Sequence, residues 1–284
     1  MILIADSGST KTEWRLVSND NNSNETCITK GINPFYQDTA EILQSLQEEY
    51  TLNNRKPQFI FFYGAGCANQ EKNKVVENAL SAFFTSEHIS INSDLVGAAR
   101  SLCQTEEGIA CILGTGSNSC HFDGEVITKN VSPLGFIIGD EGSGAVLGKR
   151  LMGDILKNQL SSPLVDLFFN TYKTDRAEIL DHIYKKPFPN RYLAQYTKFI
   201  SANVHNKELE DLVISSFKDF IQRNLLQYNN LPQLPIHFTG SIAFYFKVQL
   251  EKALATFKLT AGKISQSPME GLIHYHLQQN MNHE

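Results

Sequence analysis

The sequence contains two copies of one local pattern about a hundred residues apart, and this repeat strongly limits the possible folds. The first copy, MILIADSGSTKTEWRLV, places a short apolar strand before a hydroxyl-rich turn over residues 6–10, and a returning strand follows. The second copy, GIACILGTGSNSCHFDGEVI, repeats the strand, a Gly-Thr-Gly-Ser turn and two further strands around an Asp-Gly hairpin. One such turn alone is equally well an ordinary hairpin. Two of them, each heading one half of the chain, predict two phosphate-binding turns that face each other across a cleft.

Strands and helices alternate between and after the two copies. The run QFIFFYGAG is continuously apolar, which predicts an interior strand covered on both faces. Amphipathic helices are expected at DTAEILQSLQEEY and KNKVVENALSAFF, and a helix of small residues at DLVGAARSL. Residues 143–230 are mostly helical in pattern, and PIHFTGSIA and GKISQSPMEGLIHYHLQQ each return to a strand, a turn and a helix.

Length, charge and cysteine content exclude several classes of protein. A chain of 284 residues has room for one large domain or two ordinary ones. The net charge of −5 provides no basic field for nucleic acid, and no apolar run is long enough to span a membrane. The N-terminus starts directly with a core strand rather than a signal segment, so we expect a cytoplasmic protein. The five cysteines include no C-x-x-C pair, which favours buried free thiols over a zinc site or disulfides.

The turns taken together resemble those of the superfamily of sugar kinases, Hsp70 and actin-like ATPases. DSGSTKT is similar to the first phosphate hairpin, LGTGS to the second, and TGSIA to the adenosine-binding turn. Within this superfamily the chain resembles the N-acetylglucosamine kinase group of the BadF/BadG/BcrA/BcrD-type ATPase family. That likeness rests on the pairing of GTGSN with PLGFIIGDEGSG, on Asn33 and on Asp94, and the motifs cover essentially the whole chain in the right order.

The resemblance implies a fold and a division of the chain. The expected fold class is α/β, with two ribonuclease-H-like (actin-like ATPase) domains flanking a cleft. The expected domains are residues 1–107 and residues 108–284, the second with a helical insertion. The last helix, from Met269, is expected to pack back on the first domain, and a hinge is expected near residues 103–108.

The resemblance also implies an activity and its partners. It predicts an ATP-dependent kinase that phosphorylates a hydroxyl of N-acetylglucosamine or a related amino sugar, with ATP and Mg²⁺ as cofactors. The expected partner is therefore a small-molecule amino sugar, and kinases of this class are often homodimers. Two departures stand out: Ser7 and Ser9 replace glycines of the first hairpin, and Leu134 stands where the animal enzymes carry Trp. The second departure lies on the expected sugar side and leaves the choice of sugar open.

Phosphoryl transfer depends mainly on positioning and charge neutralisation, which the turns can provide. The resemblance assigns nucleotide binding to Gly8, Ser9, Thr10, Lys11, Thr115, Gly116, Gly240, Ser241 and Tyr245. Lys11 is equally well a solvated lysine after a turn, and Tyr245 a half-buried core tyrosine. Asp6 resembles the residue that holds Mg²⁺ through water, the alternative being a simple turn cap.

Asp94 is the expected catalytic residue. It stands where a strand ends and a helix begins, so from position alone it is equally an N-cap. The resemblance makes it the general base for the attacking sugar hydroxyl. The expected sugar-binding residues are Asn33, Asp94, Ser117, Asn118, Pro133, Leu134, Gly135 and Asp140. Amides and carboxylates suit sugar hydroxyls and an N-acetyl group. Met269, Leu272 and the histidines His237, His274 and His276 are interpreted as structural.

Two other functions fit parts of the pattern. One is an activator ATPase that drives electron transfer to an acyl-CoA dehydratase or reductase and holds an iron–sulfur cluster at a dimer interface. Cys103, Cys111 and Cys120 do not form the Gly-flanked arrangement that such a cluster needs. The other is a sugar-binding sensor without turnover, against which the presence of Asp94 counts.

Overall fold

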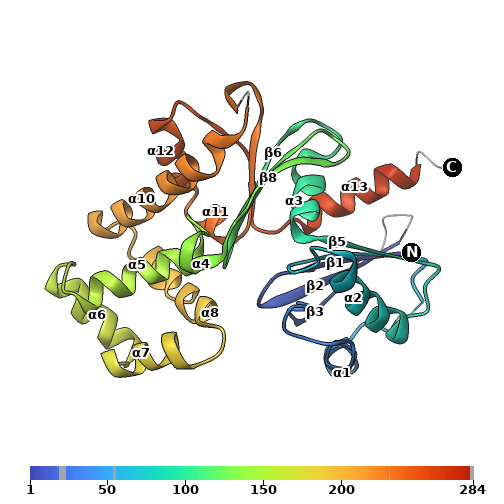
Figure 1. Cartoon of the computed structure of the whole chain (residues 1–284), viewed down its shortest axis with the longest axis horizontal. Coiled ribbons are helices and arrows are strands. Elements are labelled where there is room, and N and C mark those ends of the chain that lie inside the picture. Colours follow the sequence, from blue (N-terminus) through green and yellow to red (C-terminus); the bar gives the residue numbers. More distant parts are fainter. Residues whose placement is uncertain (19–23, 54–55, 230, 282–284) are drawn as a thin grey trace. The chain divides into compact units, whose positions relative to one another are not determined.

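The computed structural model describes residues 1–18, 24–53, 56–229 and 231–281, and the chain forms two compact units (Figure 1). Unit 1 comprises Met1–Glu107, Phe122–Ile127 and Ser267–Glu284, and unit 2 comprises Gly108–His121 and Thr128–Gln266. Each unit has its own sheet and its own helices. The domain bounds 1–107 and 108–284 stay a prediction about which parts of the chain fold independently.

Unit 1 is built on a five-stranded sheet with the order β3-β2-β1-β4-β5. Its strands are β1 (Ile2–Ser7), β2 (Lys11–Val17), β3 (Asn24–Lys30), β4 (Phe59–Gly64) and β5 (His88–Ser93). Strand β1 pairs antiparallel with β2 and parallel with β4, and β4 pairs parallel with β5. The predicted turn over residues 6–10 is too long, because Asp6 and Ser7 continue the pairing of β1 on both sides.

Both faces of the β1 strand are covered, which explains its unbroken apolar sequence. The helices of unit 1 are α1 (Thr39–Glu49), α2 (Gln70–Phe83), α3 (Asp94–Cys103) and α13 (Met269–Met281). Leu3 and Ala5 belong to the core that α1 and α2 complete, whereas Ile2 and Ile4 pack with Met269 and other residues of α13. Helices α3 and α13 lie side by side (Figure 1). Met269 and Leu272 are buried in this second core, as predicted.

Unit 2 repeats the strand order of unit 1. Its strands are β6 (Gly108–Leu113), β7 (Ser117–Phe122), β8 (Ile127–Val131), β9 (Ile236–Thr239) and β10 (Ala261–Ser265). Read from β8, the order is β8-β7-β6-β9-β10, so β6 takes the place of β1 and β9 that of β4. Strand β6 pairs parallel with β9, and β9 with β10. The predicted fold class, two ribonuclease-H-like α/β units, is confirmed.

Helices fill most of the rest of unit 2. They are α4 (Gly135–Ile138), α5 (Gly144–Leu156), α6 (Ser162–Tyr172), α7 (Arg176–Lys185), α8 (Pro189–Ala194), α9 (Thr197–Ala202), α10 (Lys207–Arg223), α11 (Ser241–Tyr245), α12 (Lys247–Thr256) and two short 3₁₀ helices, Leu225–Gln227 and Leu231–Gln233. Helix α10 buries Leu209, Val213 and Phe217 at helical spacing, which directs one apolar stripe into the core. The helical content predicted for residues 143–230 is therefore present.

Two further features bear on the class of protein, namely the state of the cysteines and the apolarity of the helices. All five cysteines are buried thiols outside any disulfide, as predicted. None of the helices in the described parts of the chain is long and apolar enough to cross a membrane.

Candidate active site

The two acidic candidates of unit 1 lie at one edge of its sheet. Strands β1, β4 and β5 are parallel, and Asp6 is level with Tyr63, which is level with Asn92. Asp94 follows two residues after Asn92, as the first residue of α3. Because the carboxyl ends of parallel strands meet at the same edge, the fold brings both carboxyl groups together where α/β proteins bind their ligands.

Burial perturbs both carboxyl groups, and the negative charge of Asp94 adds to the shift of Asp6. Burial, and then the negative charges of Asp94 and Glu13, raises the pKa of Asp6 to about 7, against the positive charge of Lys11. Burial raises the pKa of Asp94 to about 6, although the backbone N–H groups of Asp94 and Leu95 favour its charged form. Two acids whose charge is this poorly compensated are typical of a functional site.

Asp94 is not the N-cap of its helix. Ser93 takes that position, and its Oγ accepts a hydrogen bond of 3.3 Å from the backbone N–H of Val96. The alternative interpretation of Asp94 as a cap is therefore wrong. The carboxyl group stands in the first turn, where the helix dipole favours its charged form.

The first phosphate-type turn, residues 8–10, is short and rests on a glycine. The Gly8 N–H donates to the Lys11 carbonyl at 3.0 Å, and the Gly31 N–H donates to the Thr10 carbonyl at 3.2 Å. A Cβ atom on Gly31 would lie 2.4 Å from the Gly8 carbonyl oxygen, so a side chain there would displace the turn. Sequence reasoning missed Gly31, although a glycine directly after a strand was a visible signal.

Buried hydroxyl groups brace this turn from beneath. The Ser7 and Thr12 hydroxyls lie 2.7 Å apart, and Ser7 Oγ accepts a bond of 2.9 Å from the Ile32 N–H. Gly8, Thr10 and Lys11 are exposed and Ser9 is half-buried. Ser7 therefore supports the turn, and residues 8–11 form its accessible part.

Asn33 is held by its own segment, residues 33–37, and lies close to the loop that follows β4. Its Oδ1 accepts a bond of 2.9 Å from the Phe35 N–H, and its own N–H donates to Gln37 Oε1 at 2.8 Å. Gly66, at φ +85°, passes so close that a Cβ atom there would lie 2.3 Å from Asn33 Oδ1. The next residue, Cys67, is near Asp94: burial and then the charge of Asp94 raise the pKa of its thiol to about 12. The sequence predicts a Gly turn after this strand, but not that the turn lies close to both Asn33 and Asp94.

Unit 2 gathers its turns at the equivalent edge. Ile112 of β6 is level with Thr239 of β9, and Thr239 with Ser265 of β10. Gly240, at φ +113°, packs on the end of β6, where a Cβ atom would lie 2.3 Å from the Leu113 carbonyl oxygen. The predicted adenosine turn therefore adjoins the predicted phosphate turn, and only glycine fits between them.

Helix α5 holds the second phosphate-type turn in place. The Gly144 N–H donates to the Gly114 carbonyl at 2.8 Å, and the Ala145 N–H donates to the Thr115 carbonyl at 3.0 Å. The nearby candidates Ser241 and Tyr245 are exposed. Tyr245 is 59% exposed, so its alternative interpretation as a core residue is wrong.

Asp140 stands against the start of β7. Its carboxylate accepts a bond from the Ser117 N–H, and an oxygen of that carboxylate lies 3.0 Å from where a Cβ atom on Gly116 would stand. Its backbone has φ 54°, and its N–H donates to the Pro133 carbonyl at 2.9 Å. Burial, and then the charge of Glu141, raises the pKa of Asp140 to about 6, against the Ser117 N–H and the charge of Lys149.

The remaining candidates for sugar binding in unit 2 lie on or near the loop from Pro133 to Asp140. Leu134 is 58% exposed at φ 62°, and Gly135 follows at φ 73°. Gly139, one of the glycines that flank Asp140 and Glu141, packs so tightly that a Cβ atom would lie 2.0 Å from the Pro133 carbonyl oxygen. Asn118 Oδ1 accepts a bond of 2.9 Å from Asn130 Nδ2, which ties this amide to β8. Within unit 2, the structure thus brings Pro133, Gly116, Ser117 and Asp140 together.

The acidic residues of unit 1 fit a magnesium ion that is held mainly by other ligands. Within the parts of the chain that the structure describes, no three His, Cys, Asp or Glu side chains gather as a metal cage. Mg²⁺ usually takes one or two carboxylates and completes its shell with water and phosphate oxygens. The raised pKa values of Asp6 and Asp94 show uncompensated negative charge of the kind that a divalent cation relieves.

Two solved structures share the fold at low sequence identity. A candidate N-acetylglucosamine kinase from Chromobacterium violaceum aligns with a TM-score of 0.76 at 17% identity, over 96% of this chain and 98% of that one. Component A of the (R)-2-hydroxyglutaryl-CoA dehydratase of Acidaminococcus fermentans aligns with a TM-score of 0.50 at 14% identity, over 98% and 96%. No protein-family model and no curated protein sequence matches the chain significantly.

A third structure is much more similar. A candidate N-acetylglucosamine kinase from Porphyromonas gingivalis aligns with a TM-score of 0.95 at 45% identity, over 99% of this chain and 100% of that one. Identity at this level over the whole length reflects common descent rather than a shared fold alone. The chain therefore belongs to the same family of sugar kinases as the Porphyromonas gingivalis protein.

Proposed function

We propose that this protein is an ATP-dependent kinase that phosphorylates a hydroxyl group of N-acetylglucosamine or a closely related amino sugar. The observation that carries the proposal is the pair of half-buried carboxyl groups, Asp6 and Asp94, beside an exposed turn at the carboxyl edge of the unit 1 sheet. The family supplies the reaction class, and the likeness to the Porphyromonas gingivalis protein supports the amino sugar.

In the proposed mechanism Asp94 is the general base. Its carboxylate accepts the proton of one sugar hydroxyl as the hydroxyl oxygen attacks the γ-phosphorus of ATP, and ADP leaves with the electron pair of the broken bond. A base is most effective when its pKa lies near the working pH, and burial moves the pKa of Asp94 to about 6. Asp94 also orients the hydroxyl by accepting its hydrogen bond.

The other candidate residues bind and neutralise the nucleotide. Asp6 would hold Mg²⁺, directly or through water, and the ion would offset charge on the β- and γ-phosphates. In unit 1 the exposed turn from Gly8 to Lys11 would donate hydrogen bonds to phosphate oxygens, and Lys11 would add a positive charge. In unit 2, Thr115 and Gly116 would donate to phosphate. Gly240, Ser241 and Tyr245 would border the adenosine.

The sugar is proposed to bind through fixed polar groups in each unit. In unit 1 the bond that Asn33 Oδ1 accepts from the Phe35 N–H orients the side-chain amide, which would pair with an acetamido group or a hydroxyl. In unit 2 Asp140 would accept bonds from sugar hydroxyls, with Ser117, Asn118 and the backbone of residues 133–135 beside it. Pre-oriented groups of this kind favour one stereoisomer over another.

A substrate panel tests the proposal. We expect sugar-dependent release of ADP, measured by coupled assay with Mg²⁺ and ATP, to be fastest with N-acetylglucosamine or one of its N-acetylated epimers and slow with glucose. Mass spectrometry should find a single added phosphate on the sugar. Equal rates with every hexose, or ADP release independent of sugar, would contradict the proposed substrate class.

The activator ATPase alternative has a separate test. The fold alone does not exclude it, because component A of the dehydratase shares the fold. Such an activator needs thiols that reach a shared iron–sulfur cluster, whereas Cys103, Cys111 and Cys120 are all buried. Protein purified without oxygen should therefore contain no iron by elemental analysis, and a brown, iron-rich preparation would favour the activator.

A further inference from the structure

The loop that carries Asp140 has a backbone that few sequences adopt unaided. This segment, residues 133–142 and here called the Asp140 loop, contains two non-glycine residues with positive φ, Leu134 at 62° and Asp140 at 54°. Side chains rarely adopt this conformation, and it persists only where surrounding contacts enforce it. The conformation matters because it sets Asp140 against the Ser117 N–H.

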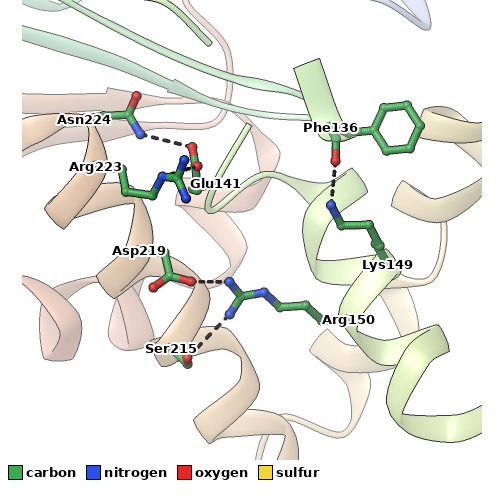
Figure 2. A network of polar contacts seen from close by, with 8 residues as sticks. All are labelled: Phe136, Glu141, Lys149, Arg150, Ser215, Asp219, Arg223 and Asn224. Atoms are coloured by element: carbon green, nitrogen blue, oxygen red, sulfur yellow. Dashed lines mark hydrogen bonds and ion pairs between the residues drawn. The ribbon is translucent and has the colours of Figure 1, made fainter. Parts of the chain in front are cut away.

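Glu141 anchors the end of this loop to α10. Its Oε1 accepts a bond of 2.7 Å from Arg223 Nε, and its Oε2 lies 3.4 Å from the Asn224 Nδ2 donor (Figure 2). The Glu141 side chain is only 13% exposed, and Asn224 is buried. Both oxygens of one carboxylate are thus engaged by two adjacent residues, which fixes the orientation of Glu141 more firmly than a single contact does.

A second anchor holds the start of the loop. Lys149 of α5 donates from Nζ to the Phe136 carbonyl at 2.7 Å (Figure 2). Helices α5 and α10 are themselves joined, because Arg150 pairs with Asp219 and also donates to Ser215 Oγ at 3.4 Å. The loop is therefore held near both ends by side chains from α5 and α10.

We propose that Glu141 is a positioning residue for the sugar: through Arg223 and Asn224 it holds the Asp140 loop in the conformation that presents the Asp140 carboxylate beside Ser117. Glu141 points to Arg223 and Asn224 (Figure 2), so it acts on the sugar through the conformation of the loop, and its charge also raises the pKa of Asp140. The kinetic consequence rests on the proposed sugar kinase function, whereas the structural consequence does not.

Kinetics of three variants test the proposal. Glu141→Gln removes the charge that pairs with Arg223, and Arg223→Met removes the partner at an exposed position that should tolerate the change. Both should raise the KM for the sugar by roughly 10-fold or more, with the KM for ATP changed less than about 2-fold. Asp219→Asn is the matched control, because it breaks an ion pair between the same helices without touching the loop. It should leave both KM values as in the wild type.

Amide hydrogen exchange gives a second readout that needs no substrate. The Gly139 N–H donates to the Gly135 carbonyl at 2.7 Å and the Asp140 N–H to the Pro133 carbonyl at 2.9 Å, so both should be protected in the wild type. In Glu141→Gln and Arg223→Met these two amides should exchange roughly 10-fold faster, while the amides of β6 and α10 are unchanged.

The outcomes separate the two claims. Unchanged sugar KM and unchanged exchange in both loop variants would overturn the role of Glu141. So would loss of protection throughout unit 2, or the same rise in KM in Asp219→Asn, because either would show a general structural effect. If the wild type phosphorylates no sugar, the proposed function fails, and the exchange data alone still decide whether Glu141 holds the loop.

Discussion

At the scale of single residues, Asp94 carries the sharpest prediction. Asp94→Asn keeps the size of the side chain, and Ser93 keeps the helix cap, so the variant should fold. At pH 8 it should melt above the wild type, because it removes a negative charge that burial destabilises. Turnover should fall by roughly 10²- to 10⁴-fold, because an amide cannot take up the proton. The measurement is steady-state ADP release with N-acetylglucosamine beside thermal melting of the same sample. A folded variant within a few-fold of the wild-type rate would remove Asp94 from the mechanism.

Asp6, also at the residue scale, should show a conflict between stability and activity. Its pKa is about 7 in the folded protein and 3.8 when unfolded, so the folded state binds the extra proton between these values. Its contribution to stability is therefore present below pH 3.8 and is lost as the pH rises to about 7. Without Mg²⁺, Asp6→Asn should melt higher than the wild type at pH 8 and equally near pH 4, yet lose Mg²⁺-dependent turnover. A variant that melts lower than the wild type at pH 8 and keeps its activity would leave Asp6 a structural role only.

At the scale of elements, His276 makes the packing of α13 sensitive to pH. Its Nε2 and the Tyr63 hydroxyl lie 2.8 Å apart, its ring stacks on Phe61 at 3.7 Å, and burial, then the charge of Arg100, lowers its pKa to about 3. Between pH 6.5 and 3 the unfolded chain binds the extra proton, so stability falls as the pH falls, by at most about 1.4 kcal/mol per pH unit. We expect urea unfolding at several pH values to show that the free energy of unfolding depends less steeply on pH in His276→Gln than in the wild type. The exposed His274→Gln on the same helix is the control, and equal slopes in all three proteins would contradict the assignment.

The same scale shows how far sequence reasoning reaches. The strands and helices that meet at the carboxyl edge of each sheet were predictable from the sequence. Apolar runs, amphipathic spacing and turns rich in Gly or hydroxyl residues are local signals. The residues that hold these turns in place were not predictable, because their role depends on neighbours that are distant in sequence. Gly31 and Gly66 are required because groups distant in sequence, the Gly8 carbonyl and the Asn33 amide, pass close to them, and no local pattern indicates such a contact. The N-cap of α3 was uncertain for a related reason. Ser93 and Asp94 are adjacent and both residue types are favoured N-caps, so the sequence alone does not show that Ser93 takes the position.

At the scale of the whole molecule, unit 1 is completed by the last helix of the chain. Ile2, Ile4 and Tyr63 form one core with Met269 and Leu272 of α13, although the whole of unit 2 separates these residues in sequence. Each large apolar side chain that loses such a partner costs about 1.5–3 kcal/mol. Loss of three or four therefore approaches the total stability of an ordinary domain, about 5–15 kcal/mol.

Residues 1–107 alone should therefore fail to fold, whereas the same segment joined to residues 267–284 by a flexible linker should fold. The added segment restores α13 against β1 and α3, including the bond of 3.0 Å from Gln104 Nε2 to the Gly271 carbonyl. The measurement is circular dichroism with thermal melting, and a linked protein with Met269, Leu272 and Ile273 changed to Ser is the control for chain length. We expect a cooperative transition in the linked protein only. A cooperative transition at the same temperature in the 1–107 segment would show that the predicted N-terminal domain is complete without α13. Helix α13 would then pack on unit 1 without being needed for its stability.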